Sequence, residues 1–154
     1  FRCDFTRKWK KIYVGKYLCD FRKYLIIKNN EGVKSMKRIV IGGQIDKDRL
    51  AQMVINICGD KAIVTVKTDI EAAMDGKTNT ADYYLGACNT GGGGALAMAI
   101  ALLGANNCAT VSMPGNIKSN EEIIAEIAAG KKAFGFTAQH IDVVVPVILA
   151  EILK

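Results

Sequence analysis

The sequence from residue 37 to residue 154 predicts a three-layer α/β/α domain with a mostly parallel sheet of about five strands. Short runs of apolar and β-branched residues alternate there with longer segments of helical periodicity. Glycine or a good capping residue separates most of these segments. Such alternation is typical of right-handed βαβ units, which build parallel sheets. We find no internal repeat, linker or low-complexity tract within this region.

The expected strands are short, and most of them end at residues that favour a turn or a loop. Valine and isoleucine dominate 38–41 and 62–66, and their branched side chains favour extended backbone. Gly42 and Gly43 are expected to end the first strand. The full set of expected strands is 38–41, 62–66, 83–87, 108–113 and 133–136, with Pro114-Gly115 as the turn after the fourth.

The expected helices follow from apolar spacing and from capping residues. Leu50, Met53, Val54 and Ile57 fall at i, i+3, i+4 and i+7, on one face of a helix for which Asp46 is a candidate N-cap. This first helix covers 47–58. A short second helix is capped by Thr68 or Asp69, runs through Met74 and closes at Gly76. The remaining expected helices are 95–103, then 120–129, which has a capping box between Ser119 and Glu122 and ends at Gly130, and a last helix opened by Thr137.

Two of these helices have an unusual composition. The segment 95–103 contains only Ala, Leu, Met and Ile, which predicts a helix that is buried on most sides. In the last helix, the apolar residues keep helical spacing across Pro146. Because proline removes only one helical hydrogen bond, this spacing predicts one kinked helix rather than two.

The positive charge of the chain is confined to its first 35 residues. The whole chain has a formal net charge of +6, which on its own would favour a nucleic-acid partner. Residues 1–35 hold ten Lys/Arg and three Asp/Glu, whereas residues 36–154 hold eleven Lys/Arg and twelve Asp/Glu. The domain itself is therefore close to neutral, and we expect no nucleic-acid partner for it.

Residues 1–35 allow two explanations. They form either a basic arm that contacts phosphate or an anionic membrane, or a translated leader upstream of a true start at Met36. The run Glu31-Gly32-Val33 can be encoded by a ribosome-binding sequence at a suitable distance before Met36, which favours the leader. We therefore expect 1–35 to be a non-native leader or a disordered basic segment, and 37–154 to be a single domain.

The cysteines, the single histidine and the apolar runs bound the class of protein further. The five cysteines are scattered, no CxxC or Cys/His metal spacing occurs, and the only histidine is His140. An odd, scattered set indicates reduced thiols, as in the cytosol. No apolar run reaches the roughly 18–20 residues of a membrane span. We expect a cytoplasmic protein with no metal and no cofactor.

A glycine loop follows the expected third strand and is the strongest candidate site. Its sequence is Cys88-Asn89-Thr90-Gly91-Gly92-Gly93-Gly94, and an apolar helix follows at once. Ligands of open parallel sheets bind beyond the carboxyl ends of the strands, and a helix N-terminus offers free amides to an anion. A plain strand-to-helix turn is the alternative, but four consecutive glycines cost up to roughly 1 kcal/mol each in backbone entropy. This entropic cost favours a binding site for phosphate or carboxylate over a plain turn.

Cys88 and a few residues elsewhere in the chain are further candidates for the site. A Cys88 thiolate facing a helix N-terminus would be stabilised and could move a proton or accept a group; a small buried hydrophobe is the alternative. Gly43 and Gln44 follow the first strand and could form the far wall of the site. His140 is read mainly as a polar residue of the last helix, and Asp82 as a solvated turn residue.

The glycine loop matches none of the common nucleotide-binding motifs well. No GK[ST] follows it, so it is not a Walker motif. It fits GxGxxA weakly through Gly92, Gly94 and Ala97. A dinucleotide site would need that motif after the first strand and an acidic residue about 20 positions further on. Neither condition holds, which argues against NAD.

Three segments carry a resemblance to a known family. They are Ile70-Glu71-Ala72-Ala73-Met74, the run from Asp82 to Gly91, and Gly130-Lys131-Lys132-Ala133-Phe134-Gly135. Over 37–154 the chain resembles the YhfU-like family of uncharacterised bacterial proteins. The resemblance implies a cytosolic bacterial protein that serves a transport or catabolic gene set, with a membrane transporter as a partner.

A second, local resemblance concerns only the loop. Cys88-Asn89-Thr90-Gly91-Gly92-Gly93 is similar to the Cys-Gly-Thr-Gly-x-Gly loop of ribose-5-phosphate isomerase B. The similarity implies that Cys88 would be the base and that Asn89 to Gly93 would form the anion hole. Here Asn89 replaces a glycine, and no counterpart of that family's N-terminal catalytic histidine is found.

The sequence leaves more than one function open. The first is binding of a small phosphorylated or carboxylated metabolite at Asn89–Gly94. The second is a sugar-phosphate isomerase-like or phosphoryl-carrier enzyme that uses Cys88. The third is an interaction protein with a basic arm, which requires residues 1–35 to be native. A homo-oligomer is compatible with all three, since the apolar helix 95–103 could lie at a subunit contact.

Overall fold

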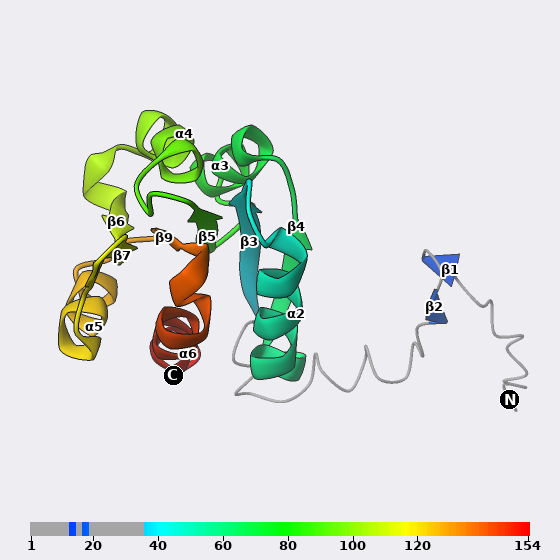
Figure 1. The fold of residues 1–154 in the computed structure, drawn as a ribbon. Helices are drawn as coiled ribbons and strands as arrows, with labels where there is room; N and C mark the ends of the chain where they lie inside the picture. The colour runs from blue at the N-terminus through cyan, green and yellow to red at the C-terminus, as the bar shows by residue number, and fades with distance from the viewer. Residues whose placement is uncertain (1–12, 15–16, 19–35) are drawn as a thin grey trace, which may run out of the picture. The chain divides into compact units, whose positions relative to one another are not determined.

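The computed structural model describes residues 36–154 and, in addition, the backbone of residues 13–14 and 17–18 (Figure 1). The chain divides into two units, Phe1–Ser35 and Met36–Lys154. In the first unit, β1 (Tyr13–Val14) and β2 (Tyr17–Leu18) pair antiparallel. The expected leader or basic segment otherwise lies outside the described residues. No helix in the described part of the chain is both long and apolar enough to cross a bilayer.

The second unit is built on five strands, all parallel, in the order β4-β3-β5-β9-β6. β3 reaches two residues beyond the expected strand, because Gly42 and Gly43 continue the pairing with β5 instead of ending it. The sheet confirms the predicted fold class. Its strands are β3 (Lys37–Gly43), β4 (Ala62–Val66), β5 (Tyr83–Cys88), β6 (Cys108–Thr110) and β9 (Ala133–Thr137).

Helices cover both faces of this sheet and complete the three layers (Figure 1). One apolar core lies between the sheet and α2, α5 and α6, and a second lies between the sheet and α3 and α4. The helices are α2 (Lys47–Cys58), α3 (Asp69–Lys77), α4 (Gly94–Leu103), α5 (Asn120–Ala128) and α6 (Ile141–Ile152), with 3-10 turns at Gly59–Lys61, Ala105–Asn107 and Ala138–His140.

The connections between the strands share one handedness. The crossovers from β3 to β4 and from β6 to β9 run in one direction across the sheet, through α2 and α5 on one face. The crossovers from β4 to β5 and from β5 to β6 run in the opposite direction, through α3 and α4 on the other face. Parallel connections of a single hand require this arrangement.

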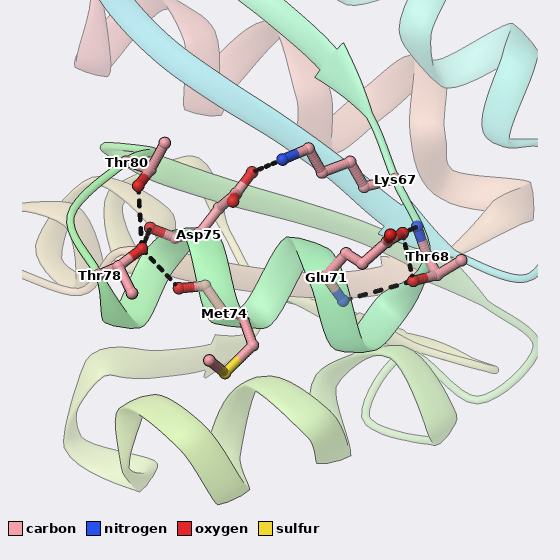
Figure 2. A network of polar contacts seen from close by, with 7 residues as sticks. All are labelled: Lys67, Thr68, Glu71, Met74, Asp75, Thr78 and Thr80. Carbon is pink, nitrogen blue, oxygen red and sulfur yellow. Dashed lines mark hydrogen bonds and ion pairs between the residues drawn. The ribbon is translucent and has the colours of Figure 1, made fainter.

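The starts of two helices follow the capping rules, and a third does not. Ser119 and Glu122 form the predicted capping box at the start of α5, and Thr68 and Glu71 form another at the start of α3 (Figure 2). At α2, Asp46 occupies the predicted N-cap position, but it has a φ of 50° and its side chain caps no amide. Its carboxylate lies instead 3.7 Å from Arg49.

The helix α4 differs from its prediction in burial. Only its inner residues Ala95, Leu96 and Ala99 are buried, while Met98 and Ile100 are exposed. An apolar composition therefore did not indicate burial on most sides, because one layer of helix covers this face of the sheet and nothing described lies beyond it.

Three further segments depart from or extend the expectations. α3 runs past Gly76 to Lys77. The expected strand 108–113 is divided into β6 and β7 (Ser112–Met113), and β7 forms a hairpin with β8 (Asn116–Ile117) across the predicted turn. The last helix is continuous through Pro146, as its spacing predicted, although a 3-10 turn precedes it.

Candidate functional site

A row of glycines crosses the centre of the sheet below the candidate site. Gly42, Gly86 and Gly135 lie side by side in register on β3, β5 and β9. A Cβ at Gly86 would lie 3.0 Å from the Cβ of Ala95, and one at Gly135 would lie 2.9 Å from that of Leu96. Gly86 and Gly135 therefore let the first turn of α4 sit directly on the sheet, where a side chain at either position would hold it away.

Tyr84 fixes the same turn of α4 from below. Its ring lies between two of these glycines, since a Cβ at Gly42 or Gly86 would meet the phenol at 2.6 or 2.8 Å. The hydroxyl donates a 2.9 Å hydrogen bond to the carbonyl oxygen of Ala95. Burial, assisted by the nearby carboxylate of Asp69, strongly raises the pKa of Tyr84, so the phenol stays protonated and donates.

The glycine loop spans the gap between β5 and α4, and its glycines have different surroundings. Gly91 has a φ of 75° and its Cα lies against the carbonyl oxygen of Ser112, so no other residue fits there. Gly93 lies beneath the hydroxyl of Thr90, and a Cβ at Gly92 would lie 3.1 Å from the Thr110 hydroxyl. Gly94 faces open space, so packing alone does not explain it.

The loop presents its polar groups at the surface. Asn89, Thr90 and Gly94 are exposed, whereas Cys88 and Gly91 are buried. The N-cap of α4 is Gly93, which has no side chain, and the first helical bond runs from the amide of Ala97 to the Gly93 carbonyl. The amides of residues 94–96 therefore precede the helical bonding pattern, and no side chain caps them.

Gly43 and Gln44, the residues expected to form the far wall, lie against Ala87 at the end of β5, and their donors are used inside the protein. The Cα of Gly43, at a φ of 94°, lies against the carbonyl of Ala87. The Gly43 amide donates to one carboxylate oxygen of Asp69 at 2.5 Å, and the Gln44 side-chain amide donates to the other at 3.0 Å. Gly43 and Gln44 therefore hold Asp69 instead of offering these groups to a ligand.

Asp69 itself was considered only as a helix cap in the sequence. It is 8% exposed, and its carboxylate is held at the end of β3 by the Gly43 amide and the Gln44 side chain. The sequence did contain a signal for this position. Asp69 comes shortly after β4, and the carboxyl end of a parallel strand lies at the same edge of the sheet as that of its neighbour, here β3 with Gly42 and Gly43.

A second polar cluster on the other side of Cys88 includes residues that sequence reasoning missed. Cys88 lies opposite Thr137 in the register of β5 and β9. The Thr137 hydroxyl contacts the Nδ1 of His140 at 2.7 Å, and the Thr137 amide donates to the Ser112 hydroxyl at 3.1 Å. His140 is therefore brought to the edge that carries the glycine loop. The position of His140 beside the loop follows only from the pairing of β5 with β9, and this pairing joins residues that are far apart in the sequence.

The cysteines of the described region are buried free thiols. Burial raises the pKa of Cys58 and of Cys108, as expected for cysteines that act as small hydrophobes. The Cys88 sulfur lies 3.8 Å from the Thr90 hydroxyl, inside the loop. The described residues contain no cluster of His, Cys, Asp or Glu that could hold a metal ion.

Asp82 is an anchor between strands, not a solvated turn residue. It accepts hydrogen bonds from the Arg38 amide and from the Arg38 guanidinium, both at 2.8 Å. These bonds join the starts of β3 and β5, at the end of the sheet away from the loop, and they lower the pKa of the Asp82 carboxyl.

The fold and the loop together define a doubly wound α/β protein with a glycine-rich connection at the carboxyl end of its central strand. The chain belongs to the family described as protein of unknown function DUF2620, whose model matches residues 37–152. It is 39% identical over 115 residues to the "Uncharacterized protein YhfU" of Escherichia coli strain K12, covering 74% of this chain and 97% of that protein. The proteins of the same name from Escherichia coli O6:H1 and Shigella flexneri match to the same extent. No solved structure matches the chain significantly.

Proposed function

We propose that this protein binds a small anionic metabolite, carrying a phosphate or a carboxylate, at the loop Asn89–Gly94. The observation that carries the proposal is the uncapped first turn of α4, which opens onto an exposed loop instead of onto a capping side chain. Free amides at a helix N-terminus attract an anion through hydrogen bonds and through the helix dipole.

The position of the loop in the sheet supports the same proposal. The helix that follows β3 covers one face of the sheet, and the helix that follows β5 covers the other. The connections that leave β3 and β5 therefore turn to opposite faces of the sheet, although the two strands are neighbours. Open α/β sheets bind their ligands at such a position. In this proposal the anion contacts the amides of residues 94–96 and the side chains of Asn89 and Thr90. Gly43 and Gln44, which hold Asp69 in place, form the far wall of the site.

A second candidate function is an enzyme that uses Cys88. The observation that favours it is the pairing of Cys88 with Thr137, whose hydroxyl contacts His140. A thiolate at Cys88 would take a proton from a substrate carbon and return it to the neighbouring carbon, while the loop held the oxyanion. Alternatively, the thiolate would attack the phosphorus of a phosphorylated donor, so that an S–P bond forms while the bond from phosphorus to the donor breaks and the dephosphorylated donor leaves with that electron pair.

Thermal unfolding of the full chain with a panel of phosphorylated sugars and carboxylates tests the binding function. A ligand at about 100 times its dissociation constant stabilises the folded state by about 2.7 kcal/mol. We expect Gly92→Asp to abolish the stabilisation and Gly92→Asn, which has the same shape without the charge, to retain it. Equal loss in both variants, or no stabilisation by any compound, would argue against an anion site.

Cys88→Ser separates the two candidates. Retained binding with no loss of any turnover supports a binding protein, whereas retained binding with lost turnover supports the enzyme. In a cell we expect the protein in the cytoplasm, with a membrane transporter as a partner. Copurification with a transporter encoded nearby is the measurement that checks this expectation.

A further inference from the structure

The strand β4 is an edge of the sheet, and its sequence lacks the features that normally protect an edge. Its residues are Ala62-Ile63-Val64-Thr65-Val66, with neither a proline nor a charge among them. Among the described residues its pairing partner is β3 alone (Figure 1). Natural proteins usually place a lysine, a proline or a bulge in such a strand to prevent pairing with another chain.

The unpaired backbone groups of this edge can be identified. The amide of Lys67 donates to the carbonyl of Ile41 in β3 at 3.0 Å, so the backbone groups of Lys67 face inward. Successive residues of a strand direct these groups to opposite edges. The N–H and C=O groups of Ala62, Val64 and Val66 therefore face the free edge, in the spacing that an added strand requires.

Apolar side chains flank the same edge. Ile63 is 49% exposed and Val66 is 45% exposed, although both belong to a strand of the central sheet. Ile63 points to the face opposite Ala62 and Val64, where α3 packs against β3, β5 and α4. Val66 points to the same face as Ala62 and Val64, at the last position of the strand. On this second face α2 packs on β4 and leaves Ile55 48% exposed.

One of the two lysines that flank the strand already has an acidic partner. The Lys67 ammonium lies 2.6 Å from the carboxylate of Asp75 in α3 (Figure 2). A second strand laid along β4 in the opposite direction would bring Lys61 near the other Lys67. Because the charge of Lys67 is paired with Asp75, this approach does not set two unpaired lysines against each other.

We propose that two copies of this protein dimerise by pairing their β4 strands antiparallel, about a two-fold axis at Val64. This axis sets Val64 opposite Val64 and Ala62 opposite Val66, so every outward backbone group of the strand finds a partner. Only another extended strand can form hydrogen bonds with a whole row of outward N–H and C=O groups. When the second strand is the same β4 in antiparallel orientation, the pair has two-fold symmetry and the assembly stops at a dimer. The two sheets become one continuous sheet, with the two α2 helices side by side on one face.

Sedimentation of the full chain at several protein concentrations tests the dimer. Val64→Pro removes an outward N–H but no bond to β3, and edge strands tolerate proline at such positions. We expect Val64→Pro to raise the dimer dissociation constant by about 100-fold or more. The matched control Val64→Ala shortens the side chain but keeps the N–H, and it should leave the dimer in place.

Two further variants keep the test decisive. Val66→Pro removes another outward N–H from a more exposed residue, and it should also dissociate the dimer if Val64→Pro fails to fold. Ile100→Lys alters the exposed apolar face of α4, and the dimer should survive it. A monomeric wild-type chain, a dimer that persists in folded proline variants, or a dimer lost only in Ile100→Lys would each overturn the proposal.

Amide hydrogen exchange gives an independent readout. The amides of Ile63 and Thr65 bond to β3 and should be protected at all protein concentrations. Those of Val64 and Val66 should be protected only at concentrations where the dimer forms, and should exchange quickly on dilution. Protection of Val64 and Val66 in a monomer would mean that another segment of the same chain covers this edge, and would overturn the proposal.

Discussion

The hydroxyl of Tyr84 donates a hydrogen bond to the carbonyl oxygen of Ala95 and so ties the central strand β5 to the first turn of α4. We expect Tyr84→Phe to lower the free energy of unfolding by about 1–2 kcal/mol, because it removes a buried donor. Denaturant unfolding measures this. Tyr83→Phe is the control, since the Tyr83 hydroxyl makes no hydrogen bond to the described residues. An equal effect of both substitutions would show that the bond contributes nothing specific.

Gly135, in the glycine row, and Gly94, at the start of α4, have different surroundings, which predict opposite effects of an alanine substitution. In Gly135→Ala the new methyl group meets the carbonyl of Gly91 and the side chain of Leu96. We expect a loss of about 1–3 kcal/mol of stability, as for other overpacked sites, and a displaced loop. Gly94→Ala enters open space at the first position of a helix and should be neutral or stabilising by up to about 1 kcal/mol. Thermal unfolding of both variants compares them, and equal stabilities would contradict the packing described for the row.

The ion pair between Arg38 and Asp82 predicts a pH dependence of stability. The pair lowers the pKa of Asp82 in the folded state, so the unfolded chain binds the proton more readily. The contribution is therefore present above the unfolded pKa of about 3.9, and it is lost as the pH falls through the lower folded pKa. We expect Asp82→Asn to be less stable than wild type at pH 7, with a difference that shrinks below about pH 4. Denaturation of both proteins across this range measures the difference, and a constant difference would contradict the assignment.

The capping box of α5 predicts a moderate effect of a surface substitution. The Ser119 hydroxyl accepts from the Glu122 amide at 3.2 Å, and the Glu122 carboxylate accepts from the Ser119 amide at 2.7 Å. Ser119→Ala removes the first bond and should cost about 1 kcal/mol. Ser119→Asp keeps an acceptor and should restore most of the loss in a denaturant titration. Failure of aspartate to restore stability would argue against a capping role.

Local signals in the sequence predict most elements of the fold. The periodicity of α2, the capping boxes of α5 and α3, and the β-branched run of β4 each depend on residues close together in the chain. The exposed outer face of α4 could not be predicted, because its composition is apolar whether or not another layer covers it. The end of β3 was missed because Gly42 is kept in the strand by its pairing with Gly86, a contact 44 residues away.

In the candidate site, too, only the features that are local in the sequence could be predicted. The loop Cys88–Gly94 is visible in the sequence because its glycines are consecutive. Its surroundings are not visible, since Ser112, Thr137 and Asp69 reach the loop only through the order of the strands. For the same reason the sequence could not show that Asp69 occupies the donors of Gly43 and Gln44.

An NMR titration of the full chain with inorganic phosphate and with a sugar phosphate examines the proposed anion site one amide at a time. We expect the amide resonances of Gly94, Ala95 and Leu96 to move progressively and saturate, and we expect Gly92→Asp to abolish the change while Gly92→Asn does not. Unchanged resonances for these three amides, or saturable changes confined to another part of the domain, would contradict the assignment of an anion site to this loop.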